Sequence, residues 1–175
     1  MALTKLHGNM IEDGTVSPTH LHASSKSVVV QRVLSSTGAV ATGTTITPSD
    51  DTVPTSSEGT EFMTANITPT SATNYLDISG VVHASASTSG RITVAVFVGA
   101  SATPISVAGQ AIANNNNIFA IPFRARVVAG STSELTIRVR AGLHNAGTVT
   151  FNGEGGNRLY GGSLVSYIEI SEIKA

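Results

Sequence analysis

Short runs of alternating apolar and polar residues fill most of the chain after residue 26. The clearest is 134–140, where Leu135, Ile137 and Val139 face one way while charged and hydroxyl side chains face the other. A period of two indicates a half-buried β-strand. Further strands are predicted at 27–34, 39–46, 61–68, 75–84, 91–98, 105–113, 118–128, 148–151 and 164–173. Strands at this spacing predict an all-β fold, an antiparallel β-sandwich that we expect to be a jelly roll.

Two of these runs are apolar on both faces. Phe97 lies opposite Ile92, Val94 and Val96, and Ile118 backs the apolar face of its own strand. Because an antiparallel sandwich normally exposes one face of each sheet, two-sided apolar strands predict a second buried surface. A subunit interface is the simplest form of that surface. The predicted interface residues are Phe97, Ile118, Val165 and Tyr167.

Residues 1–25 differ from the rest of the chain. Gly8, Gly14 and Pro18 interrupt any period, and the apolar residues are too scattered to form a core. We therefore expect an extended arm that docks on another protein, followed by one β-sandwich domain over residues 26–175. The predicted anchor residues are Leu3, Leu6, Ile11, Val16 and Leu21.

Composition excludes several classes of function. Only 12% of the 175 residues are charged and the net charge is −1, so nucleic-acid binding is not expected. The absence of cysteine excludes disulfides and thiolate metal sites. No apolar run approaches the ~20 residues of a membrane span, and no signal peptide is recognised, which predicts a soluble protein made in the cytoplasm. A mean hydropathy of +0.18 is high for so few charges and favours apolar surface buried between subunits.

A family resemblance follows from longer stretches of sequence. The stretch AVATGTTITPSDDTVPTSSEGTEFMTANITPTSATNYLDISGVV, the later GGNRLYGGSLVSYIEISEI and the opening GNMIEDGTVSPTHL together resemble jelly-roll structural proteins of tailed bacteriophages, of the tail-fibre or head-fibre type. The resemblance implies a homotrimeric β-sandwich on a virion, with the N-terminal arm as its anchor to a capsid or tail protein.

Two glycine pairs flank Asn157–Tyr160 in the sequence EGGNRLYGG. A phosphate-binding loop needs a helix after the glycines, whereas residues 164–173 alternate as a strand, with Ile168 and Ile170 on one face and Tyr167 and Glu169 on the other. We therefore expect the glycines to supply positive φ angles at a tight connection.

Several residues are candidates for metal binding or catalysis. His20 and His22 project to the same side of an extended chain and form a candidate metal site in a trimer, against the alternative of packed or exposed arm histidines. Asp50 and Asp51 suit either calcium or an Asx turn. The sequence has no G-x-S-x-G nucleophile elbow and no evident pair of catalytic carboxylates. We expect no catalytic residues and no cofactor.

Polar and aromatic loop residues offer a different chemistry. Tyr75, Asn115, Asn116 and Tyr160 are candidate contacts for a host-surface glycan, by hydrogen bonding and stacking. Alternate spacing of Arg124, Arg126, Arg138 and Arg140 allows either an arginine-lined sheet face or ordinary pairing with acidic neighbours.

The expected function is therefore that of a non-enzymatic virion protein. The first hypothesis is a trimeric fibre or adhesion protein that is anchored by its arm and displayed for host contact, where three weak contacts act together. The second is a capsid decoration or head-fibre protein that binds the capsid lattice. A polysaccharide depolymerase is a third hypothesis, from a different class.

Overall fold

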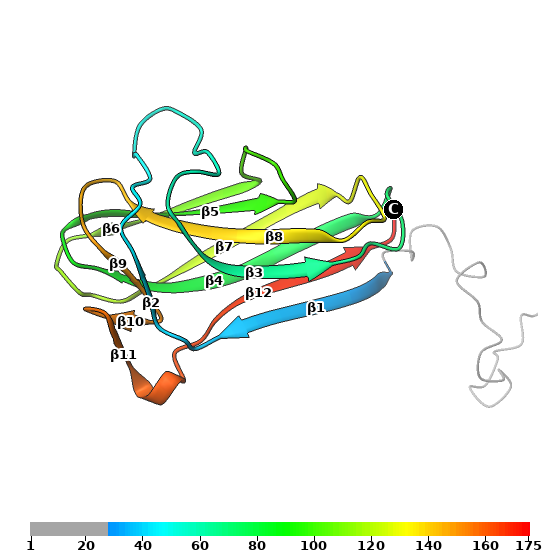
Figure 1. Ribbon diagram of the computed structural model, residues 1–175. Helices are drawn as coiled ribbons and strands as arrows, with labels where there is room; N and C mark the ends of the chain where they lie inside the picture. Colours follow the sequence, from blue (N-terminus) through cyan, green and yellow to red (C-terminus); the bar gives the residue numbers. More distant parts are fainter. Residues whose placement is uncertain (1–27) are drawn as a thin grey trace, which may run out of the picture.

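The computed structural model describes residues 28–175 as two antiparallel β-sheets packed face to face (Figure 1). One sheet has the order β1-β12-β4-β7 and the other β3-β8-β5-β6. The short strands β2 and β9 extend the first sheet at one end of β4, and β10 pairs with β11. The strands are β1 (Val29–Thr37), β2 (Ala41–Gly43), β3 (Thr60–Ile67), β4 (Tyr75–Ala86), β5 (Gly90–Val98), β6 (Ser106–Ile112), β7 (Phe119–Val128), β8 (Leu135–Leu143), β9 (Val149–Phe151), β10 (Gly153–Glu154), β11 (Asn157–Arg158) and β12 (Ser166–Ile173).

This strand order confirms the predicted jelly roll. The last long strand, β12, lies between β1 and β4, and β8 lies between β3 and β5, so the chain crosses repeatedly between the two sheets. Such alternation defines the double-sheet jelly roll. Each predicted strand is found, with its ends shifted by a few residues.

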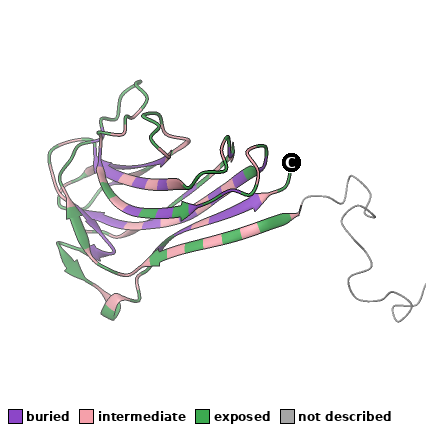
Figure 2. Cartoon of the chain, turned by 45° about the vertical axis from the view of Figure 1, so that its right-hand side comes forward, coloured by how far each residue is buried: buried purple, intermediate pink, exposed green. Residues whose placement is uncertain are grey.

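The core lies between the two sheets, where purple segments of the cartoon face each other (Figure 2). Leu76, Ile78 and Val82 of β4 pack opposite residues of β5 and β8 such as Val94 and Val139, and all are at most 1% exposed. Burying one such side chain is worth about 1.5–3 kcal/mol. The alternating pattern of the sequence therefore stabilises the sandwich directly.

The predicted strand over residues 39–46 is much shorter than expected. It is reduced to Ala41–Gly43, after which residues 44–59 leave the sheet and cross to the outer side of the other sheet. We call residues 44–59 the covering loop. Thr47 of this loop is buried, at 2% exposed, and its backbone N–H donates to the carbonyl oxygen of Leu143 over 2.9 Å.

The glycine segment EGGNRLYGG forms a small hairpin, β10–β11, and one short 3₁₀ turn. Gly155, Gly156, Gly161 and Gly162 all have positive φ, between 55° and 94°. A Cβ on Gly38 would lie 2.0 Å from the carbonyl oxygen of Gly162, so the turn docks tightly on the end of β1. This confirms the predicted structural role of the glycines.

Candidate interaction surface

The outer side of the β1-β12-β4-β7 sheet, which we call the open face, is formed by cross-strand rows of side chains. Strand register puts Arg32, Ser171, Asp77 and Arg126 in one row. The next row holds Leu34, Glu169, Ser79 and Arg124, and a third holds Ser36, Tyr167, Val81 and Pro122. Because successive residues of a strand point to opposite sides, these rows belong to one face.

Opposite charges alternate across the open face. The Nη2 of Arg126 donates to Oδ2 of Asp77 over 2.6 Å, and its guanidinium lies 5.7 Å from the ring centre of Tyr75. Hydrogen bonding by Arg126, assisted by the charges of Arg126 and Arg124, holds the pKa of Asp77 below its ordinary value despite partial burial. Arg32 pairs with Glu169 over 3.3 Å. Each of these two acidic side chains is therefore matched by an arginine on a neighbouring strand.

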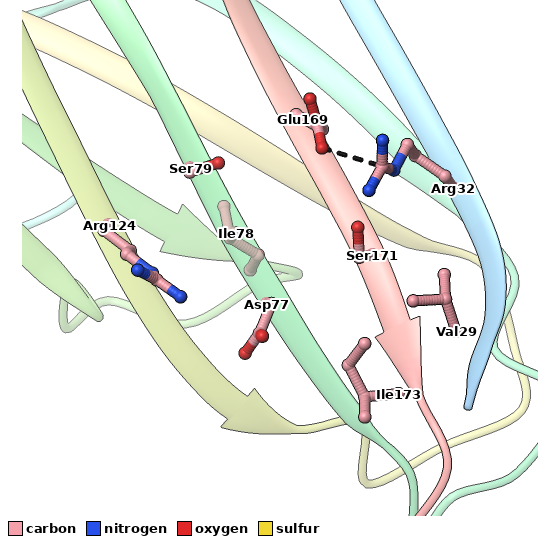
Figure 3. A pocket seen from close by; sticks show the side chains of 9 residues that line it. All are labelled: Val29, Arg32, Asp77, Ile78, Ser79, Arg124, Glu169, Ser171 and Ile173. Atoms are coloured by element: carbon pink, nitrogen blue, oxygen red, sulfur yellow. Dashed lines mark ion pairs between the residues drawn. The ribbon is translucent and has the colours of Figure 1, made fainter. Parts of the chain in front are cut away.

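A shallow hollow of about 330 Å³ lies among these charges (Figure 3). Arg32 and Glu169 face each other on one side of it, and Arg124 stands on the other side beside Asp77. Within residues 28–175, Arg124 forms no ion pair. The guanidinium of Arg124 thus keeps its hydrogen-bond donors available for an acidic or carbonyl group of a binding partner.

Large apolar side chains are exposed on the same face. Leu34 is 63% exposed, and Tyr75, Val128 and Tyr167 are also exposed. Tyr75 and Val128 are direct cross-strand partners. Clustered exposed apolar groups among polar ones are typical of a protein–protein contact.

The outer side of the β3-β8-β5-β6 sheet is covered instead along β5. Its residues Thr93, Ala95 and Phe97 are at most 7% exposed. The covering loop lines a narrow space with Thr93 and Val107, and Arg140 donates to the carbonyl oxygens of Glu58 and Gly59 in that loop. The loop is also tied to the β5–β6 turn by the Ser56 N–H, which donates to Ala102 O.

The prediction that Phe97 forms a subunit interface is therefore wrong. Its side chain has no exposed surface in a single chain, and the Arg138 guanidinium lies 5.7 Å from its ring centre. Arg138 is held there by a 3.1 Å hydrogen bond to the Ser101 carbonyl oxygen. The second apolar surface at β5 is buried by the chain's own segments. Ile118, which precedes β7, is half-buried.

Val165 and Tyr167, the other two predicted interface residues, are each 37% exposed. Tyr167 belongs to the open face through its pairing with Val81. Their assignment to a subunit interface stays a prediction. The open face around Tyr167 is the surface on which such an interface could form.

The four arginines singled out in the sequence do not share one face. Arg124 and Arg126 lie on the open face, whereas Arg138 and Arg140 lie on the covered side of the other sheet. Arg140 pairs with Glu61 over 3.4 Å. The alternative of pairing with acidic neighbours describes Arg126, whose partner is Asp77, and Arg140, whereas Arg138 donates to the Ser101 carbonyl oxygen.

The four candidate glycan contacts are also separated. Tyr75 begins β4, whereas Asn115 and Asn116 lie in the β6–β7 loop beyond the other end of that strand. At ~3.3 Å per residue the twelve residues of β4 span roughly 36 Å. Tyr160 is 75% exposed on the 3₁₀ turn. These residues therefore do not form a single site.

A buried carboxylate was missed by the sequence analysis. Glu172 is fully buried at the end of β12 and accepts hydrogen bonds from Gln31 Nε2 (2.6 Å) and Asn74 Nδ2 (2.6 Å). It also accepts from the backbone N–H and the hydroxyl group of Thr70. Burial alone would raise its pKa, but the donors outweigh burial and lower the pKa to about 2. The available signal was the period of β12, which puts Glu172 on the same face as Ile168 and Ile170.

His20 and His22, and the anchor residues Leu3, Leu6, Ile11, Val16 and Leu21, lie outside the described residues. Within residues 28–175 no group of three or more histidine or acidic side chains is placed to hold a metal ion. Asp50 forms the Asx turn considered above, since its Oδ1 accepts from the Thr52 N–H and hydroxyl. Within the same range, no helix has the length and apolar character needed to cross a membrane.

Comparison with known proteins adds little beyond the fold. No family model and no curated protein matches the sequence. The structure of Eiger TNF from S. frugiperda is similar over 82% of this chain and 93% of that chain, with 9% identity and a TM-score of 0.47. The infectious bursal disease virus VP2 subviral particle is similar over 84% of this chain, which spans only 39% of the VP2 chain, with 15% identity and a TM-score of 0.35. At these values the jelly-roll assignment rests on strand order.

Proposed function

We propose that this protein is a bacteriophage virion structural protein, a homotrimeric jelly roll anchored by residues 1–25 and displayed for contact with the host surface. The observation that carries the proposal is the open face, where exposed apolar side chains are interleaved with charges of both signs. The resemblance of the sequence to phage fibre and head-fibre proteins supports the same assignment.

A second copy of the chain is the partner that the chemistry of the open face favours. Arg32, Arg124 and Arg126 alternate with Asp77 and Glu169, so the face is not dominated by one sign of charge. A face with a single sign selects an oppositely charged partner, whereas a mixed face with exposed Leu34 and Tyr167 suits contact with another copy of the chain. In a closed three-fold ring the open face would meet a different surface of the next copy. Trimerisation would bury these apolar groups and fix the relative orientation of the copies.

The trimer is tested by light scattering on the purified full chain. We expect a mass three times the 17.9 kDa of one chain. Leu34→Glu puts an unpaired charge on the open face and should give the monomer mass. Val53→Glu is the matched control, because Val53 is also 63% exposed but lies on the covering loop, and it should remain trimeric. A monomeric wild-type protein contradicts the proposed trimer.

The place on the virion is tested by imaging particles that carry a labelled copy. Density at the tail supports the fibre or adhesion role. Density over the capsid lattice contradicts that role and supports a decoration or head-fibre protein. Deletion of residues 1–24 should leave the oligomer folded but absent from particles. Loss of folding would show instead that these residues belong to the domain.

A further inference from the structure

A second hollow, of about 330 Å³, lies at the end of the sandwich away from Val28 and Ala175. Five hydroxyl or amide side chains and one turn line it: Thr42, Ser87, Asn116, Thr148, Thr150 and Gly155–Gly156. They come from β2, the β4–β5 turn, the β6–β7 loop, β9 with the residue before it, and the β10–β11 turn. Segments distant in sequence thus converge on a single concave surface, which we call the end hollow.

Hydrogen bonds hold the end hollow in shape. The Asn116 backbone N–H donates to Ala86 O over 2.7 Å and fixes this residue at a positive φ of 62°. The Gly156 N–H donates to the Thr150 hydroxyl over 3.0 Å, and the Thr148 N–H donates to the Ser87 hydroxyl over 2.9 Å. Because the segments are tied to one another before any ligand arrives, little ordering has to occur on binding.

The two turn glycines keep the end hollow open. A Cβ on Gly155 would lie 3.9 Å from the Asn116 side-chain amide, and one on Gly156 would lie 4.0 Å from the Thr42 methyl group. Both have positive φ, of 55° and 81°. A larger side chain at either position would therefore project beside the polar groups of the hollow.

The chemistry of the lining defines the class of ligand. No lining residue is charged, so the hollow offers no side-chain counter-charge to an anion or a metal ion. Within residues 28–175 the Asn116 amide and the Thr42 and Thr148 hydroxyls make no side-chain hydrogen bond, so each keeps both donor and acceptor capacity. Groups that donate and accept at short spacing match the hydroxyls of an uncharged sugar, each of which also donates and accepts.

We infer that the end hollow is a binding site for a neutral saccharide. The host-surface origin of that saccharide rests on the proposed function, whereas its chemical class rests on the lining residues alone. Val29 pairs with Ile173, so β1 begins and β12 ends at the other end of the sandwich (Figure 1). An arm leading into Val28 and fixed to a particle would leave the end hollow directed outward.

The inference is tested by NMR on the isotope-labelled full chain. The probes are glucose, galactose, mannose and N-acetylglucosamine, with glucuronic acid as the charged comparison. At least one neutral sugar should shift the Asn116 side-chain amide signals with a dissociation constant in the millimolar range, which is usual for a single small sugar. Gly156→Asn should weaken this response by about tenfold or more, because the added side chain competes for the same space.

The matched control is Gly130→Asn. Gly130 also has a positive φ, of 70°, but a Cβ there meets nothing within 4 Å, and asparagine tolerates this backbone conformation at both positions. The control should bind sugar as the wild type does. No response to any neutral sugar, an equal response to glucuronic acid, or unchanged binding by Gly156→Asn would each overturn the inference. If the protein is a trimer but does not bind sugar, only the saccharide site is refuted. If it is a monomer that binds sugar, only the proposed trimer is refuted.

Discussion

Both sheets carry apolar residues on their outer sides, but these residues differ in solvent exposure. On the β3-β8-β5-β6 sheet, the chain's own segments bury Phe97 completely. On the β1-β12-β4-β7 sheet, Leu34 and Tyr167 remain exposed among charged side chains. Burial inside a single chain therefore accounts for the apolar surface at β5, whereas the exposed apolar side chains of the open face are available to a partner. The difference shows that two-sided apolar strands do not by themselves identify a subunit interface.

The largest expected effect comes from the covered side. Phe97→Ala removes a fully buried ring and should lower the free energy of unfolding by about 3–5 kcal/mol. Denaturant unfolding measures the loss, and light scattering should give an unchanged oligomeric mass. Phe97→Leu, which keeps most of the apolar volume, should cost less. A change of oligomeric state with no change in the free energy of unfolding would show that Phe97 lies in a subunit interface.

The second effect concerns Glu172, which is buried at the end of β12 and belongs to neither outer side of the sandwich. Glu172→Gln turns an amide NH₂ group toward donors such as Asn74 Nδ2, which should cost about 1–3 kcal/mol near pH 7. Because the pKa of Glu172 is lowered from 4.5 to about 2 on folding, its ionised form stabilises the wild type above pH 4.5. That contribution is lost as the pH falls toward 2.

The gap in unfolding free energy between the wild type and Glu172→Gln should therefore narrow as the pH falls through this window. Unfolding curves at several pH values between 7 and 2 measure it. A gap independent of pH would contradict the ionised, hydrogen-bonded Glu172.

The smallest of the three effects concerns the hydrogen bonds by which Arg140 holds the covering loop. Arg140 donates to Gly59 O over 2.7 Å and to Glu58 O over 3.0 Å, and Arg140→Gln loses the charge of these bonds. We expect a cost of about 1–2 kcal/mol. Hydrogen exchange should also quicken at the Gly59 and Ser56 amides. Unchanged exchange there would show that the loop is held over β5 without Arg140.

The sequence was sufficient for the strands and the sandwich, because alternation such as Leu135, Ile137 and Val139 reflects burial on one side of a sheet. The positive φ values of the glycine turn were predictable for a similar local reason. Phe97 was misassigned because a sequence pattern shows that a face is covered but not by which segment. The covering loop approaches β5 from residues 44–59, a distance in sequence that no local period reports.

The binding surfaces were less accessible from sequence. The open face depends on the register of four strands, so Arg124 and Glu169 become neighbours only once β4 and β12 are paired. Asn116 was identified by residue type alone, whereas its partners Thr42, Thr150 and Gly156 come from other segments. Glu172 was visible in the period of β12, but its five donor groups come from β1 and the β3–β4 loop.

The pairing of the first long strand with the last has a consequence for synthesis of the protein. Within residues 28–175, β1 pairs with β12 alone, from Thr37 opposite Ser166 to Val29 opposite Ile173. At about 5–20 residues per second the ribosome needs roughly 6–26 s to make the intervening chain. During that time β1 is unpaired and the β12 side of β4 is an exposed strand edge, open to association with other nascent chains. A messenger truncated before the codon for Ser166 would thus yield an aggregation-prone product, because the first sheet can be completed only after β12 has been made.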